Sequence, residues 1–215
     1  MATPEQVTEY EQKWQTAVDT VFSVVDADGW KKEHSKEKDL EIFIRHDKSS
    51  SFAQVKSVTT VHSTLDAVEQ CFKTVKTVDD KTPKDQREGA IERRLLGQAG
   101  DGADGAGFFY IVVESSSRLV SPREFLCYQK IARKDGKIAL VRTSIENEAL
   151  HKVGKGNVRG NMIFQGFVAE PEGDNIKLTF VVQADPCGSV PAMVYNTVAT
   201  GQGYNLLSMR KELNH

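Results

Sequence analysis

The stretch SVPAMVYNTVATGQGYNLLSMRKEL, residues 189–213, decides the fold of this chain. Pro191 suits the first turn of a helix, because that position needs no backbone N–H. Arg210 and Lys211 suit the last turn, where the helix dipole favours positive charge. The spacing predicts a helix over residues 191–213 with one largely apolar stripe that covers a core. The residues of this stripe are Val190, Met193, Val194, Thr197, Val198, Tyr204, Leu207 and Leu213.

Two glycines, Gly201 and Gly203, interrupt this helical pattern. Each costs about 1 kcal/mol relative to alanine in a helix interior. One interpretation is a helix that must bend or lift away from the protein. The other is an ordinary closing helix that tolerates the pair, and the sequence leaves both interpretations open.

Upstream of this stretch the sequence predicts a helix and then mostly strands. Thr3 and Gln6 form a capping box that begins a helix over residues 4–26. A second helix is expected from Leu65 and a short third one after Pro83. Short polar turns between the later strands favour an antiparallel meander, and therefore one α+β domain over residues 1–215. Strands are expected at residues 40–45, 52–61, 91–96, 108–114, 125–133, 137–145, 158–170 and 176–184.

A strongly twisted sheet of about eight strands tends to curl. The concave face of such a sheet must be covered, and the terminal helix is the available cover. Several side chains with an inward phase are small or polar, which is unusual for a packed core. We therefore expect unfilled space between the sheet and the helix.

Composition excludes several classes of protein. The 215 residues carry 28 basic and 30 acidic side chains, a net charge of −2, which gives no reason to expect a nucleic-acid partner. The first residues lack a signal-peptide pattern, and no apolar run is long enough to cross a membrane. Three cysteines without CxxC spacing predict free thiols in a cytoplasmic protein. The five scattered histidines predict no metal site, and we expect no cofactor.

Short motifs in a fixed order resemble those of one known family. SPREF at residues 121–125 is similar to the SPRDF-like motif of the START (steroidogenic-acute-regulatory-related lipid-transfer) domain family, and the resemblance spans roughly residues 30–213. The chain lacks the WD pair usual near residues 75–85, and it carries a glycine-rich insertion at residues 97–107. The further matching pieces are DG at 135–136, RTS at 142–144, VRG at 158–160, FVAEP at 167–171, KLTF at 177–180 and DPCGSVP at 185–191.

The resemblance implies a helix-grip fold, in which a curved antiparallel sheet wraps around a long C-terminal helix and encloses an apolar tunnel. One lipid would occupy this tunnel, and the C-terminal helix and the loop before the SPREF strand would form its lid. The tip of that loop, Leu119 and Val120, either touches a bilayer or folds inward. With Gly201 and Gly203, these two residues are the candidates for lid movement and membrane contact.

Strand alternation then names candidate tunnel residues. Glu114 with Gln129 is a candidate pair for a lipid headgroup, although Glu114 would equally suit solvent at a strand end. Arg123 is expected to make a structural ion pair. The expected lipid-binding residues are Tyr110, Val112, Glu114, Phe125, Cys127, Gln129, Asn161, Ile163 and Gln165 from the sheet, with Met193, Thr197 and Tyr204 from the helix.

Three functions remain compatible with the sequence. The favoured one is a monomeric, non-enzymatic carrier that exchanges a lipid at membrane surfaces, with a phospholipid preferred over a sterol or ceramide because the candidates are polar. The second is a helix-grip enzyme, a hydrolase or cyclase, acting on a small apolar substrate, for which only Tyr110 and Glu114 offer an acid–base pair. The third is a lipid sensor without net transport.

Overall fold

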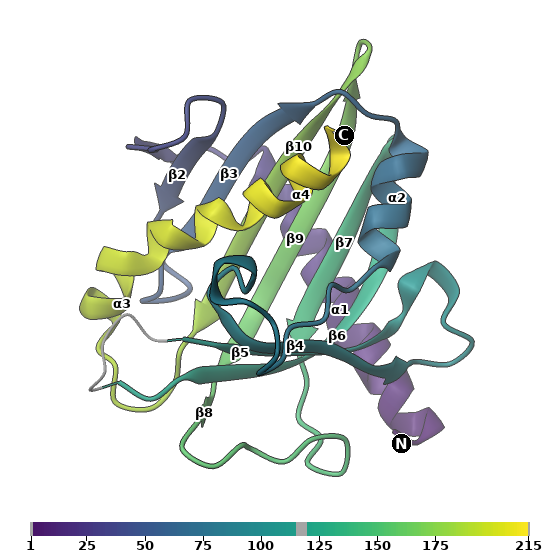
Figure 1. Ribbon diagram of the computed structural model, residues 1–215, viewed down its shortest axis with the longest axis vertical. Helices are drawn as coiled ribbons and strands as arrows, with labels where there is room; N and C mark the ends of the chain where they lie inside the picture. The colour runs from purple at the N-terminus through teal and green to yellow at the C-terminus, as the bar shows by residue number, and fades with distance from the viewer. Residues whose placement is uncertain (1, 115–119, 215) are drawn as a thin grey trace.

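The computed structural model describes residues 2–114 and 120–214, and within them ten strands form one curved sheet (Figure 1). The strand order is β1-β2-β3-β10-β9-β7-β6-β5-β4, and the short β8 adds to β6. Neighbouring strands on this path are antiparallel, whereas β8 is parallel to β6. The strands are β1 (Lys31–Glu33), β2 (Glu41–Arg45), β3 (Gln54–Val61), β4 (Ala90–Gln98), β5 (Gly107–Val113), β6 (Arg123–Lys134), β7 (Lys137–Ser144), β8 (Val158–Arg159), β9 (Asn161–Glu172) and β10 (Asn175–Asp185).

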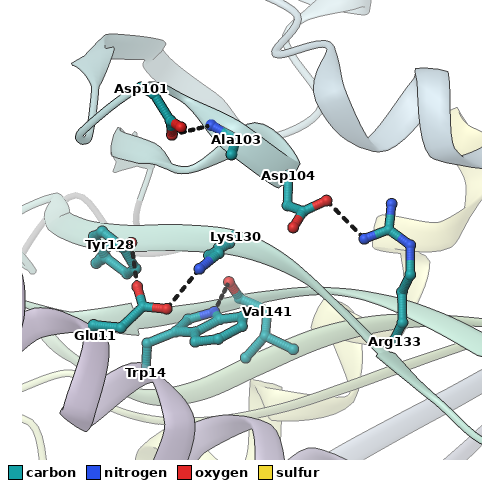
Figure 2. Close-up of polar contacts among 9 residues, drawn as sticks. All are labelled: Glu11, Trp14, Asp101, Ala103, Asp104, Tyr128, Lys130, Arg133 and Val141. Atoms are coloured by element: carbon teal, nitrogen blue, oxygen red, sulfur yellow. Dashed lines mark hydrogen bonds and ion pairs between the residues drawn. The ribbon is translucent and has the colours of Figure 1, made fainter.

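The N-terminal helix α1 (Pro4–Val25) covers one side of the sheet, which we call the outer face (Figure 1). The predicted capping box is present, since Thr3 and Gln6 each bond the other's backbone N–H. Trp14 donates its indole N–H to the carbonyl of Val141 at 3.1 Å (Figure 2). The Trp14 bond and the apolar cluster that α1 shares with the sheet hold the helix in place.

The contact between α1 and the sheet is close. A methyl group on Gly166 of β9 would approach Val21 Cγ1 to 2.5 Å, so only glycine allows the helix this near. Glu11 forms an ion pair with Lys130 at 2.6 Å and accepts a hydrogen bond from the Tyr128 hydroxyl (Figure 2). At the end of α1, Trp30 donates to the carbonyl of Val24.

The opposite side, which we call the inner face, is covered by α2 (Leu65–Lys73) and by the C-terminal segments (Figure 1). The C-terminal segments are α3 (Ala192–Val198), the 3₁₀ segment η3 (Ala199–Asn205) and α4 (Leu206–Leu213). Leu206 and Leu213 are buried in an apolar cluster with Phe72 of α2 and with Leu140 and Phe180 of the sheet. The terminal cover is therefore confirmed, but it is not one continuous α-helix.

The glycine pair lies inside the 3₁₀ segment. Gly203 is buried against Ile42 of β2, and an added Cβ there would lie 3.0 Å from Ile42 Cγ2. Gly201 is exposed, with nothing within 4 Å of the same position. The two glycines thus differ in role, because Gly203 permits close packing whereas no contact requires Gly201.

Some predicted elements need correction. The third helix is only a single 3₁₀ turn, η1 (Lys84–Gln86), and the edge strand β1 was not predicted. The strand expected over residues 158–170 is divided at Gly160, where a Cβ would lie 2.5 Å from the Phe125 ring. The glycine-rich stretch is the loop of the β4–β5 hairpin, as predicted, and contains the short 3₁₀ turn η2 (Ala103–Gly105).

The loop of this hairpin is tied to the sheet by polar contacts. Asp101 accepts a hydrogen bond from the backbone N–H of Ala103, and Asp104 forms an ion pair with Arg133 of β6 at 2.7 Å (Figure 2).

Among residues 2–114 and 120–214, no helix has the length and apolar character to cross a bilayer.

Candidate functional site

Three polar side chains lie side by side on the inner face and form what we call the Arg142 cluster. Arg142 donates from Nε to Gln129 Oε1 at 2.9 Å and from Nη1 to Gln165 Oε1 at 3.0 Å. The flat face of the guanidinium stacks on the Phe109 ring at 3.8 Å, and Phe167 lies 5.7 Å away on another strand. The cluster combines a fixed positive charge with aromatic walls.

Strand pairing explains why these side chains meet. Arg142 of β7 is the direct cross-strand partner of Gln129 of β6 and of Gln165 of β9. Side chains opposite one another in neighbouring strands point to the same face. Along β7, Ile138 and Leu140 occupy the same inward phase and are buried, and Ser144 ends this row, so Arg142 is its one charged residue.

Arg142 is deeply placed but not sealed. Burial lowers the pKa of its guanidinium to about 10, yet the residue is only half-buried. Arg142 is therefore surrounded by protein but keeps part of its surface accessible. No carboxylate among the described residues forms an ion pair with it, although such burial normally requires a counter-ion.

Apolar side chains border the Arg142 cluster on two sides. On one side lies a small cluster that includes Phe109, Phe125, Cys127, Met162 and Ala184. Burial raises the pKa of the Cys127 thiol to about 11, so this thiol is neutral near pH 7. On the other side lies the larger cluster beneath the C-terminal segments, to which Phe167 belongs. The inner face therefore presents one polar spot between two apolar regions.

Four of the predicted sheet residues lie on this inner face. Phe125 and Cys127 belong to the smaller apolar cluster, and Gln129 and Gln165 belong to the Arg142 cluster. Arg142 itself was not among the predicted site residues. Its inward phase next to Leu140 was the signal that could have identified it.

The alternation predicted through Asn161 and Ile163 is wrong. The pairing of β9 with β10 shifts there, since Phe164 pairs with Gln183 while Met162 pairs with Ala184. Ile163 is the extra residue of this bulge, and it breaks the period of two. Asn161 and Ile163 are both exposed, and Ile163 keeps 38% of its surface accessible.

Tyr110, Val112 and Glu114 do not share a wall with Phe125. Tyr110 pairs with Leu126 and Val112 with Glu124, so both point to the outer face. Glu114 follows the end of β5 and is exposed, whereas Gln129 pairs with Gly107 at the opposite end. The Glu114–Gln129 headgroup pair is therefore wrong.

Tyr110 instead joins a buried polar network around Glu124. Its hydroxyl donates to Glu124 Oε2 at 3.1 Å, so the acid–base pair of Tyr110 with Glu114 does not form either. Glu124 Oε2 also accepts from the Gly154 backbone and the Asn157 amide, each at 2.9 Å, and Oε1 forms an ion pair with Arg159 at 2.7 Å. Burial alone would raise the pKa of Glu124, but the Asn157, Gly154, Arg159 and Tyr110 donors together lower it.

The predicted helix residues are mostly on the wrong side. Met193 is 77% exposed and Thr197 is exposed, because this face of α3 points to solvent rather than to the sheet. Tyr204 is half-buried beside the apolar cluster under η3, and its hydroxyl accepts from the Lys36 N–H at 3.1 Å. In α3, Tyr195 packs against this apolar cluster, and the fully buried residues of the C-terminal segments begin at Ala199.

The loop before β6 is described only in part. Val120 is half-buried, and Leu119 lies outside the described residues. Among the described residues Arg123 forms no ion pair, contrary to expectation, and it donates instead to the carbonyl groups of Pro186 at 2.9 Å and Cys187 at 3.2 Å. These bonds tie the start of β6 to the segment that leads into α3.

Two surface depressions are also present, with volumes of about 420 and 410 Å³. The first is lined by residues including Leu207 and Arg210, and the second by residues including Thr59 and His62. Neither is lined by the Arg142 cluster, so the apolar tunnel stays a prediction of the family resemblance. Among the described residues, no group of three or more His, Cys, Asp or Glu side chains is placed to hold a metal ion.

Comparison with known structures gives the same fold. The human StAR-related lipid transfer protein 5 is 20% identical, with a TM-score of 0.75 over 96% of this chain and 97% of its own. A StAR-related lipid transfer protein fragment from Xanthomonas axonopodis is 17% identical, with a TM-score of 0.68 over 87% of this chain and 100% of its own. Human STARD10 is 15% identical, with a TM-score of 0.65 over 91% of this chain and 76% of its own.

The family itself is shown by sequence. A search of curated proteins found no match to this chain. The sequence profile of the START domain, however, matches residues 23–212, which include every strand of the sheet and nearly all of the C-terminal segments. The chain belongs to the START domain family.

Proposed function

We propose that this protein is a cytoplasmic, non-enzymatic carrier that binds one lipid at the inner face of its sheet and exchanges it at membranes. The observation that carries the proposal is the inner face itself, where the Arg142 cluster separates two apolar regions. A lipid has the matching division into a polar headgroup and an apolar tail. Removal of the tail from water contributes roughly 0.8 kcal/mol per buried CH₂.

A phospholipid is the favoured cargo over a sterol or a ceramide. Its headgroup needs several hydrogen-bond partners once it leaves water. Arg142, Gln129 and Gln165 together supply more donors than a single sterol hydroxyl uses.

Exchange requires that the cover of the inner face moves at a bilayer. Met193, Val194 and Val198 of α3 are all exposed, and they form an apolar surface next to the 3₁₀ segment that contains Gly201. We propose that this α3 surface inserts among lipid headgroups, with Leu119 and Val120 of the loop before β6 as further contacts. Gly201 then lets the cover bend without loss of a packing contact.

Two measurements test the carrier. Lipid extraction from the purified protein, followed by mass spectrometry, is expected to recover an intact lipid at one molecule per chain. Transfer of a fluorescent phospholipid between vesicles is expected to rise with protein concentration. A bound lipid without transfer would favour a sensor, and turnover of an added ester would favour an enzyme. Light scattering on the same sample is expected to give the mass of a monomer.

A further inference from the structure

We propose that the Arg142 cluster binds the anionic group, a phosphate or a carboxylate, of the carried lipid. The inference rests on the proposed carrier function and names the class of its cargo. The guanidinium of Arg142 has N–H donors that no described residue uses and no carboxylate partner among the described residues.

The guanidinium of Arg142 has more N–H donors than its protein partners use. A guanidinium has five N–H groups and no acceptor. Arg142 uses Nε and one N–H of Nη1 for the two glutamine oxygens, and no described residue accepts from Nη2. The edge formed by Nη1 and Nη2 is the edge that pairs with carboxylate and phosphate oxygens through two parallel bonds.

The two neighbouring amides add further donors. Because Gln129 and Gln165 both direct Oε1 to Arg142, each amide has its NH₂ group left for another partner. The cluster therefore presents N–H donors beside a positive charge. Ionised phosphates and carboxylates consist of acceptors and negative charge, and they complement such a surface.

Arg142 differs from two other arginines of the sheet, Arg133 and Arg159, because no carboxylate among the described residues forms an ion pair with it. Arg133 has two carboxylate partners, Glu69 and Asp104, and Arg159 has Glu124. Arg142 is deeper than Arg133 and has no carboxylate partner among the described residues. The stacked Phe109 ring attracts the cation but leaves its charge uncompensated. An anionic ligand would supply the missing charge, whereas a diacylglycerol or a sterol would not.

The test compares lipids that share tails and differ in charge. The full chain is incubated with phosphatidylcholine vesicles that contain equal mole fractions of phosphatidic acid, oleic acid or diacylglycerol. Protein-bound lipid is then measured by native mass spectrometry. Wild type is expected to take phosphatidic acid and oleate with a roughly tenfold preference over diacylglycerol, the scale of a charge-assisted bond.

Variants assign the preference to the guanidinium. Arg142→Gln is expected to abolish the preference for anionic lipids, so that phosphatidic acid and oleate are taken up no better than diacylglycerol. Arg142→Lys keeps the positive charge but loses the bidentate N–H edge, so a reduced preference for anionic lipids is expected. This variant replaces Arg142→Gln if the glutamine variant does not fold. Arg133→Gln removes the same charge from the surface end of β6 and is the matched control, with wild-type preference expected.

The outcomes separate this inference from the carrier proposal. Uptake of all lipids with the same ratio in wild type and in Arg142→Gln would overturn the anionic site alone. Uptake of no lipid by wild type would overturn both proposals. Titration calorimetry with inorganic phosphate and with acetate distinguishes the source of the anion. Binding of either ion as tightly as its lipid would show a site for a free anion and overturn the assignment to a lipid.

Discussion

Glu124 is the residue on which the end of the sheet depends. Its carboxylate is fully buried and receives donors from β5, from β8 and from the loop that connects β7 to β8. Loss of one partner of such a network leaves the other groups buried without compensation. The same network holds the start of β6, from which Phe125 and Cys127 reach the inner face.

We expect Glu124→Gln to lower the free energy of unfolding by roughly 3 kcal/mol at pH 7. The lowered pKa of Glu124 gives this loss a pH dependence. The ionised form stabilises the fold above the usual carboxyl pKa of 4.5, and this contribution disappears as pH falls through the lowered value. Urea unfolding of both proteins at a series of pH values should show the difference shrink below pH 4.5. A difference that is constant with pH would contradict the role of the charge.

Among the helices and strands, the C-terminal cover has the most unusual construction. Its two α-helical parts are joined by a 3₁₀ segment. Apart from Tyr195 of α3, its inward-packing apolar residues belong to η3 and α4. Gly201 and Gly203 are two residues apart but have different surroundings. Substitution of each by alanine therefore separates bending from packing.

We expect Gly201→Ala to stabilise the fold by up to about 1 kcal/mol and to slow lipid transfer between vesicles, because alanine stiffens the segment without touching a neighbour. Gly203→Ala should instead destabilise the fold by about 2 kcal/mol, since its Cβ overpacks Ile42. Thermal unfolding and a fluorescent transfer assay measure the two effects. An unchanged transfer rate in Gly201→Ala, with normal lipid content, would refute the bending role.

The elements that the sequence predicts well are those with a local signal. Thr3 and Gln6 mark the start of α1, and polar turns separate the strands of the meander. The sequence does not predict correctly which side chains of β5 and β9 point to the inner face. The bulge at Ile163 changes the phase of the first residues of β9, Asn161 and Met162, relative to the rest of the strand. The register of β5 against β6 places Tyr110 opposite Leu126 rather than Phe125. Both depend on pairing between strands, which periodicity within one strand does not contain.

At the scale of the whole molecule, the two faces of the sheet have different tasks. The outer face is closed by α1, whose tight contact leaves Gly166 without room for a side chain. The inner face carries the Arg142 cluster and the divided cover. Membership of the START family follows from motif order, but the charged spot at Arg142 required the pairing of three strands.

The exposed surface of α3 gives a prediction about the molecule's approach to membranes. Met193→Glu combined with Val198→Glu should reduce sedimentation with phosphatidylcholine vesicles by roughly tenfold, because two charged side chains replace apolar ones at the interface. Both positions are exposed, so thermal stability should not change. As a control, Val153→Glu changes an exposed apolar residue of the β7–β8 connection and should bind vesicles like wild type. Equal loss in the control would show a general charge effect.

The position of α1 also determines which events intrinsic tryptophan fluorescence can detect in this protein. The chain has two tryptophans, and both belong to the outer side, where Trp14 is bonded to Val141 and Trp30 to Val24. Lys56 lies 4.7 Å from the centre of the Trp30 ring on that side. Tryptophan fluorescence will therefore report unfolding, but it will not change when a lipid binds to or leaves the inner face. A titration that shows no spectral change is no sign of an inert protein, and an indole engineered beside Phe109 would restore the missing signal.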